Sequence, residues 1–197
     1  MINATTIFTN CVLFCCFFFS LFISGCSTLG YEESYDSAQT AYGKLNPNAP
    51  AETIQWGQFA GKWDCISRDL VDSIWYENKA TWKWEYILGG HAILNEWWQE
   101  DTSPNPPSKE YYATGVFIVN RETKLWEAVV LNTRPHKISS KFEAEYKDST
   151  IQMHDGTGTW LVTFYDITKD SFEWKYEVLR SKGVWSPIST ISATRRL

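Results

Sequence analysis

The sequence predicts an all-β domain that folds as an up-and-down antiparallel β-barrel of about ten strands. From Trp56 to Leu197, short runs rich in β-branched and aromatic residues recur, and turn residues separate them. Helical periodicity is nearly absent from the same region. Short connections join neighbouring strands antiparallel, and closing so long a meander into a barrel removes its unpaired edges.

The expected strands follow one another along residues 56–197 without an internal repeat. In chain order they are GKWDCIS (61–67), ATWKWEYIL (80–88), HAILNEWWQ (91–99), YYATGVFIV (111–119), LWEAVVLNT (125–133), KFEAEY (141–146), TIQMH (150–154), TWLVTFYDI (159–167), FEWKYEVLR (172–180) and VWSPISTISATRR (184–196). The clearest turn signals are Gly89-Gly90, Asn120–Thr123, Asp155–Gly158, Thr168–Ser171 and Ser181–Gly183.

Residues 1–25 have the pattern of a bacterial lipoprotein signal peptide. Residues 11–23 are almost wholly apolar but too short to span a bilayer, and they run into Ile23-Ser24-Gly25-Cys26, which matches a lipobox. Residues 1–10 contain no Lys or Arg, so a plain secretory signal or a short anchor is the alternative. We expect Cys26 to carry lipid and to anchor the protein in the bacterial cell envelope, at the outer membrane if the cell is Gram-negative.

The mature chain divides into a tether and the barrel domain. Residues 26–55 begin with the lipidated cysteine and continue as a polar, aperiodic and flexible segment, whereas residues 56–197 form the barrel. Cys65 is the one cysteine left once the signal is removed and Cys26 is lipidated. A single cysteine cannot form an intramolecular disulfide, and we expect Cys65 to fill apolar space.

Charge excludes one class of function. The formal net charge is −5 and the pI is about 5.2, and no block of Lys and Arg occurs. Nucleic-acid binding requires clustered basic charge, so nucleic acid is not a partner.

The stretch TWKWEYILGGHAILNEWW (81–98) predicts a hairpin that turns at Gly89-Gly90. In this register Lys83 lies opposite Glu96 on the outer face, a favourable pair of opposite charges. The inner face then carries Leu88, His91, Tyr86, Ile93, Trp84, Asn95, Trp82 and Trp97. A slip by one residue would expose the tryptophans, so the register is well specified.

These inward residues supply the candidate ligand site. Aromatic walls with a few polar groups are the usual lining of a small-molecule pocket, and here the polar groups are His91 and Asn95. The candidate ligand-binding residues are Trp82, Trp84, Tyr86, His91, Asn95 and Trp97. The alternative is that the same aromatic side chains simply fill the barrel as structural core.

Both ends of the domain resemble a known group of proteins. Gly61-Lys62-Trp63 has the Gly-x-Trp form of lipocalins and related calycin barrels, and Arg195-Arg196 closes the last strand. FAGKW, W-x-W-x-x-x-L-G-G, LWEAVV, Phe164–Trp174 and a Gly-Val-Trp turn also resemble an uncharacterised bacterial family of lipocalin-like barrels across residues 56–197. The resemblance implies a calycin fold, with Trp63 beneath an Arg of the final strand. It implies no activity.

The sequence gives little support for catalysis. The three histidines, His91, His136 and His154, are not paired at metal-ligand spacing, and no nucleophile, phosphate-loop or metalloprotease motif occurs. We therefore assign no catalytic residue, metal or cofactor. We expect a membrane-anchored lipoprotein that binds a small hydrophobic or aromatic ligand. The alternatives are an enzyme acting on such a molecule through His91 and Asn95, or a filled barrel that contacts envelope proteins.

Overall fold

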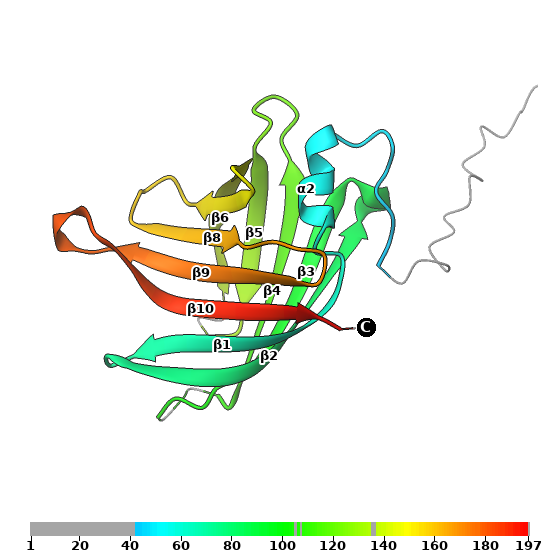
Figure 1. Ribbon diagram of the computed structural model, residues 1–197. Helices are drawn as coiled ribbons and strands as arrows, with labels where there is room; N and C mark the ends of the chain where they lie inside the picture. The colour runs from blue at the N-terminus through cyan, green and yellow to red at the C-terminus, as the bar shows by residue number, and fades with distance from the viewer. Residues whose placement is uncertain (1–41, 105, 107, 135–136, 197) are drawn as a thin grey trace, which may run out of the picture. The chain divides into compact units, whose positions relative to one another are not determined.

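The computed structural model describes residues 42–196, except for 105, 107, 135 and 136, and in this region the chain folds into a closed antiparallel barrel (Figure 1). The strands close in the order β1-β10-β9-β8-β7-β6-β5-β4-β3-β2, so each strand pairs with its neighbours in the sequence, and β1 pairs with β10. This confirms the predicted fold class, an up-and-down lipocalin-like barrel.

The ten strands of this barrel are long and connected mostly by short turns. Their bounds are β1 (Gly61–Val71), β2 (Ile74–Ile87), β3 (Ala92–Glu100), β4 (Glu110–Val119), β5 (Trp126–Asn132), β6 (Lys137–Lys147), β7 (Thr150–His154), β8 (Trp160–Tyr165), β9 (Ser171–Leu179) and β10 (Trp185–Arg195). Each expected run of sequence corresponds to one of them.

The first hairpin extends well beyond its prediction. The sequence predicts that the first strand ends near Ser67, but β1 and β2 stay paired from Gly61↔Trp84 to Val71↔Ile74. The turn at Asp72 and Ser73 is not predicted because it contains no glycine, although both residues adopt positive φ angles, 50° and 68°.

The predicted register of the second hairpin is confirmed. Trp82 pairs with Trp97, Trp84 with Asn95, and Lys83 with Glu96, and the Lys83 ammonium lies 3.1 Å from the Glu96 carboxylate. The turn differs from the expectation. The 3-10 turn η2 (Leu88–Gly90) begins one residue early, and Leu88 is exposed rather than inward because its own φ is +52°.

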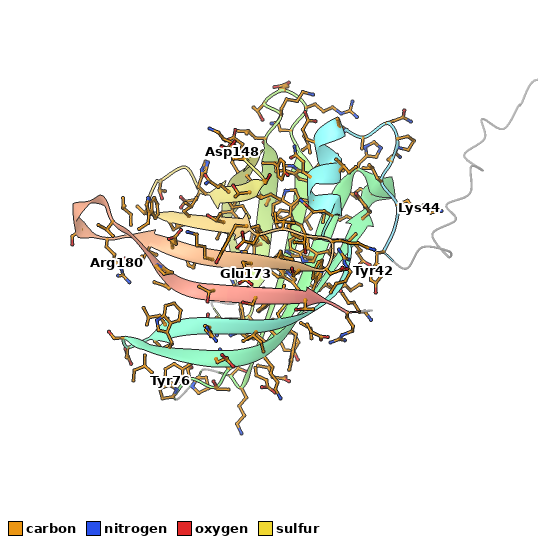
Figure 2. The ribbon with its side chains drawn as sticks, viewed as in Figure 1. Tyr42, Lys44, Tyr76, Asp148, Glu173 and Arg180 are labelled. Atoms are coloured by element: carbon orange, nitrogen blue, oxygen red, sulfur yellow. The ribbon has the colours of Figure 1, made fainter. Side chains whose placement is uncertain are left out.

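Short helical turns precede the barrel, namely η1 (Ala51–Thr53) and α2 (Ile54–Gly57), and η3 (Ser181–Gly183) lies between β9 and β10. The sequence predicts a flexible tether up to residue 55, and in the structure the described part of this segment makes hydrogen bonds to the barrel. The Tyr42 carbonyl accepts a hydrogen bond from the Tyr86 amide, and the Asn46 amide donates one to the Gly90 carbonyl. Figure 2 shows Tyr42 and Lys44 at this end of the barrel and Arg180 at the other.

α2 carries Trp56 into the barrel. Trp56 and Phe59 are fully buried, and the Trp56 ring lies 4.4 Å from that of Phe117 and 5.1 Å from that of Phe164, measured between centroids. Trp84 packs on both, with its centroid 5.3 Å from that of Trp56 and 5.4 Å from that of Phe59. We call this half of the barrel the packed half, since these five aromatic side chains fill it.

The same end is clamped by the pair that the resemblance implies. The Arg195 guanidinium lies 4.1 Å from the centre of the Trp63 ring and donates hydrogen bonds to the carbonyls of Ala60 and Gln58. The Trp63 indole N–H in turn donates to the Phe59 carbonyl at 2.7 Å. These contacts tie the first and last strands to the segment that carries α2.

The predicted signal peptide (1–25), the lipidation site Cys26 and residues 27–41 lie outside the described residues. Of the helices in the described part of the chain, none is both long and apolar enough to cross a bilayer.

Gly61 tests the clamp. Its φ is +133°, and a β-carbon there would lie 2.6 Å from Arg195 Nη1. We expect Gly61→Ala to lower the free energy of unfolding by about 3 kcal/mol, because backbone strain adds to the loss of charge-assisted hydrogen bonds. Gly89→Ala is the matched control, since Gly89 also has a positive φ but nothing lies within 4 Å of its added β-carbon. It should cost only about 1 kcal/mol in a urea titration. Equal losses would show that the clamp does not depend on Gly61.

Cys65 is buried and free, as the sequence predicts, and burial, with a smaller effect of Asp64, raises the pKa of its thiol to about 12. A raised pKa keeps the thiol neutral as pH rises past the range in which exposed thiols ionise, and only the thiolate is nucleophilic. We expect iodoacetamide to leave Cys65 unmodified in the folded protein at pH 9 and to modify it rapidly in urea, as measured by peptide mass spectrometry. Equal modification in both conditions would contradict the burial.

Candidate functional site

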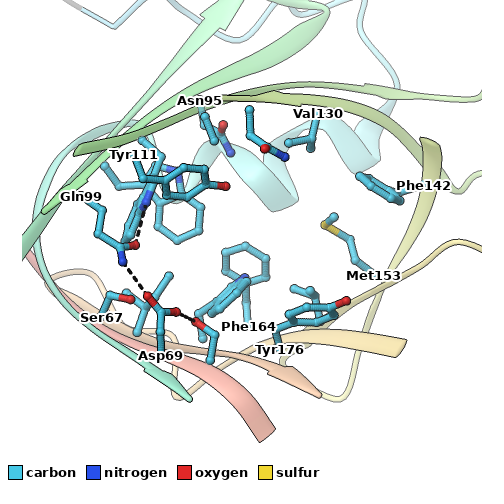
Figure 3. Close-up of a pocket in the computed structure, with 18 of the residues that line it drawn as sticks. Ser67, Asp69, Asn95, Gln99, Tyr111, Val130, Phe142, Met153, Phe164 and Tyr176 are labelled. Atoms are coloured by element: carbon cyan, nitrogen blue, oxygen red, sulfur yellow. Dashed lines mark hydrogen bonds between the residues drawn. The ribbon is translucent and has the colours of Figure 1, made fainter. Parts of the chain in front are cut away.

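The half of the barrel away from α2 is hollow. A cavity of about 530 Å³ opens among strands from all around the barrel (Figure 3). Its lining consists of Ser67, Asp69, Trp82, Asn95, Trp97, Gln99, Tyr111, Ala113, Phe117, Val130, Asn132, Arg134, Phe142, Met153, Trp160, Val162, Phe164, Trp174, Tyr176, Ser189 and Ile191. A lumen filled throughout, one of the alternatives that the sequence left open, is therefore not what the structure has.

The inner end of the cavity is formed by the aromatic side chains that border the packed half. Phe117 and Phe164 belong to both, because each contacts Trp56 on one side and lines the cavity on the other. Trp82 joins them, with its ring centroid 5.0 Å from that of Trp84. The size of the cavity thus depends on how far the α2 aromatics reach into the barrel.

Three of the predicted site residues line the cavity: Trp82, Asn95 and Trp97. They come from paired positions on β2 and β3, and the two indoles meet edge to face with their centroids 4.9 Å apart. All three are buried. The hairpin register, which the sequence specifies, is what brings them together.

The other three predicted residues lie elsewhere. Trp84 is fully buried inside the packed half. Tyr86 packs over α2, where a β-carbon on Gly57 would overlap its hydroxyl. His91 follows the turn and donates its backbone N–H to the Leu88 carbonyl. None of the three lines the cavity, because the α2 segment occupies the barrel end that they face.

The cavity wall contains an acidic side chain that the sequence pattern did not predict there. Asp69 is on β1, and its carboxylate accepts hydrogen bonds from Gln99 Nε2 (2.6 Å), Asn78 Nδ2 (3.2 Å) and Ser189 Oγ (2.7 Å). Gln99 also accepts from the Trp97 indole N–H at 3.2 Å. Inward and outward side chains alternate along β1, and Trp63 and Ser67 point inward. A strand predicted to continue beyond Ser67 would therefore have placed Asp69 inside the barrel.

A second charged group stands beside it. The Arg134 guanidinium lies 4.4 Å from the centre of the Tyr111 ring, 2.9 Å from the Asp101 carboxylate and 3.9 Å from that of Asp69. Burial raises the pKa of the Tyr111 phenol, so its hydroxyl stays neutral and can donate a hydrogen bond at physiological pH.

The segment after β3 helps to order this end of the barrel. The described residues of the proline-rich segment 101–109 join β3 to β4 at the barrel end opposite the Gly89-Gly90 turn. The Asp101 amide donates to the Lys109 carbonyl, and Thr102 donates from both its amide and its hydroxyl to the Asn78 side-chain oxygen. Asn78 and Asp101 thereby connect the loop to Asp69 and Arg134.

The described lining of the cavity is mostly aromatic and apolar, with few ionisable groups. Among the described residues that line the cavity, Asp69 is the one carboxylate, and none is a His or a Cys. Among the described residues, no three His, Cys, Asp or Glu side chains are grouped to hold a metal ion. The site offers a large aromatic surface together with a cluster of hydrogen-bonding groups around Asp69.

Known proteins share the fold. The S-type phycobiliprotein lyase CPES from Guillardia theta matches with a TM-score of 0.52 and 11% identity, over 73% of this chain and 92% of the lyase. Rv2717c from M. tuberculosis matches with a TM-score of 0.53 and 12% identity, over 78% of this chain and all of the other (100%). No model of a known protein family matches the chain, and no curated sequence matches it. At these identities the similarity establishes the lipocalin-like fold and nothing finer.

Proposed function

We propose that this protein is a lipid-anchored barrel that binds a small hydrophobic or aromatic molecule in its lumen. The observation that carries the proposal is the division of the barrel into a packed half and a cavity of about 530 Å³. That volume lies within the range of sites that take drug-sized ligands, about 300–1,000 Å³.

The lining favours a flat, apolar ligand. Trp82, Trp97, Trp160 and Trp174 come from four strands and present large rings toward the cavity, and Phe142 and Tyr176 lie near Trp160 at 5.1 and 5.8 Å between centroids. Aromatic side chains bury much area on binding and stack on planar groups. A small molecule surrounded by these rings gains most from loss of contact with water. One protein that shares the fold is a phycobiliprotein lyase.

The enzyme alternative lacks its intended geometry. It requires His91 and Asn95 to act on the same molecule, but Asn95 lines the cavity and His91 does not. Asp69 and Tyr111 both line the cavity, but Asp69 already accepts hydrogen bonds from Gln99, Asn78 and Ser189, so ligand binding remains the better supported function.

Anchoring is part of the proposal and depends on residues 1–26. The apolar run followed by Ile23-Ser24-Gly25-Cys26 supports lipidation at Cys26. A lipid anchor would hold the barrel at a membrane surface of the bacterial envelope, where poorly soluble molecules are transferred between membranes or partners.

Cavity blocking tests binding. Val130 lines the cavity and pairs with Gly115, whereas its neighbour Val129 does not line it. We expect N-phenyl-1-naphthylamine, a neutral fluorescent aromatic probe, to bind the unaltered protein and to bind Val130→Trp at least about tenfold more weakly, a loss of about 1.4 kcal/mol.

Val129→Trp is the matched control and should bind as the unaltered protein does. Circular dichroism verifies that both variants fold. Equal affinity of the two tryptophan variants, or no binding by the unaltered protein, would contradict a ligand site in the lumen. If the probe binds as expected, native mass spectrometry of protein purified from the source cells would identify the physiological ligand.

Lipidation has its own experiment. The full chain should fractionate with membranes, and Cys26→Ser should move it to the soluble fraction or leave it unprocessed, because the serine hydroxyl cannot take the thioether-linked lipid. Cys65→Ser, a buried position within the barrel, serves as the control. A Cys26→Ser protein that still carries the lipid mass would refute lipidation at this residue.

A further inference from the structure

Two polar side chains lie next to each other on the cavity wall. Ser67 and Asp69 are separated by one residue on β1, so both side chains point inward, and both line the cavity (Figure 3). Ser67 is 1% exposed.

Ser67 has no hydrogen-bond partner among the described residues. Its hydroxyl is buried, and no described residue hydrogen-bonds to it. A buried hydroxyl without a partner costs stability, so such a group at a cavity wall indicates a role in contacting something that enters. The indole N–H of Trp82 also lacks a partner, but so do those of Trp56 and Trp84 in the packed half, and they carry no inference.

Asp69 keeps capacity for one more donor. A carboxylate accepts about four hydrogen bonds. Gln99 and Asn78 donate to Oδ2 and Ser189 donates to Oδ1, which leaves a position open on Oδ1. The three donors also fix the carboxylate, so that a fourth donor meets an oriented acceptor.

The charges at this wall are unbalanced. Asp69 and Asp101 have side chains that are only 15% and 6% exposed, and they share the guanidinium of Arg134. Arg134 lies closer to Asp101, at 2.9 Å, than to Asp69, at 3.9 Å, and it is further engaged by the Tyr111 ring. Among the described side chains of this cluster, two negative charges therefore face one positive charge.

We propose that the ligand carries an amine or another cationic N–H group, which donates to Asp69 Oδ1 and Ser67 Oγ while the apolar body of the ligand lies among the tryptophans. This inference rests on the proposed function and names the class of ligand that the same cavity takes. A cation at this wall neutralises the excess charge, gives Ser67 its partner and faces aromatic rings that attract cations. A carboxylate-bearing ligand would instead place a third negative charge beside Asp69 and Asp101.

Three probes of one shape separate the possibilities. Naphthalen-1-ylmethylamine is cationic at pH 7, naphthalen-1-ylmethanol is neutral, and 1-naphthoate is anionic. Their affinities for the full-length protein can be measured by displacement of N-phenyl-1-naphthylamine or by calorimetry. We expect the amine to bind about 10- to 100-fold more tightly than the alcohol, as for a charged hydrogen bond, and the naphthoate to bind most weakly.

Two variants assign the preference to these atoms. Asp69→Asn should remove most of the advantage of the amine and leave the alcohol within about twofold, since the negative charge is lost and one acceptor oxygen becomes an NH2 group while the side chain keeps its size. Ser67→Ala should reduce amine affinity several-fold without loss of thermal stability, because no described residue hydrogen-bonds to the hydroxyl. Asp64→Asn is the control on the same strand, at an exposed position that pairs with Arg196 outside the barrel. It should leave all three affinities unchanged.

The failures can be told apart. If the alcohol or the naphthoate binds as tightly as the amine, the inference is wrong and the lumen still binds apolar molecules. An amine preference that survives in both Asp69→Asn and Ser67→Ala also overturns it, because the preference then arises elsewhere. If none of the three probes, nor N-phenyl-1-naphthylamine, enters the barrel, the proposed function fails together with the inference.

Discussion

The insertion of Trp56 into one end of the barrel determines the rest of the structure. A ten-strand barrel encloses more space than its own inward side chains fill, and here a short helical turn supplies Trp56 and Phe59 to close half of it. These two rings contact Trp84, Phe117, Phe164 and Phe172 from four strands, so the barrel end is held as one aromatic cluster. The Arg195–Trp63 clamp fastens the segment that carries them.

The cavity is the part of the lumen that this insertion does not reach. Phe117 and Phe164 of the aromatic cluster close its inner end, and tryptophans line its walls. Several of its polar groups cluster around Asp69, on β1, β3 and β10. Asp69 connects three strands through Gln99, Asn78 and Ser189. The same hydrogen bonds that hold the wall in place orient the carboxylate, and so the rigidity of the site and its polarity have one cause.

The fold can be predicted from the sequence because the alternation of residues within each strand, the turn residues between strands and the pairing of the strands all indicate the same barrel. Alternation, turn residues and the Lys83–Glu96 pair specify the register that places Trp82, Asn95 and Trp97 together. Prediction from the sequence fails where tertiary packing decides which side chains line the cavity. The segment 42–57 is too short and too polar to show hydrophobic periodicity, yet it inserts Trp56 into the barrel. Because this segment fills that end of the barrel, Trp84, Tyr86 and His91 do not line the cavity. Asp69 was missed because the strand continues to a turn without glycine.

The most direct measurement is fluorine NMR of the protein labelled with 5-fluorotryptophan, during titration with N-phenyl-1-naphthylamine. The eleven tryptophans sample both halves of the barrel and its exterior. If the lumen is divided into a packed half and a cavity, the resonances of Trp160 and Trp174 shift on binding, and those of Trp63 and Trp126 in the packed half do not shift. Shifts confined to the exposed Trp75 and Trp185, or largest at Trp63 and Trp126, would contradict a ligand cavity in the open half of the barrel.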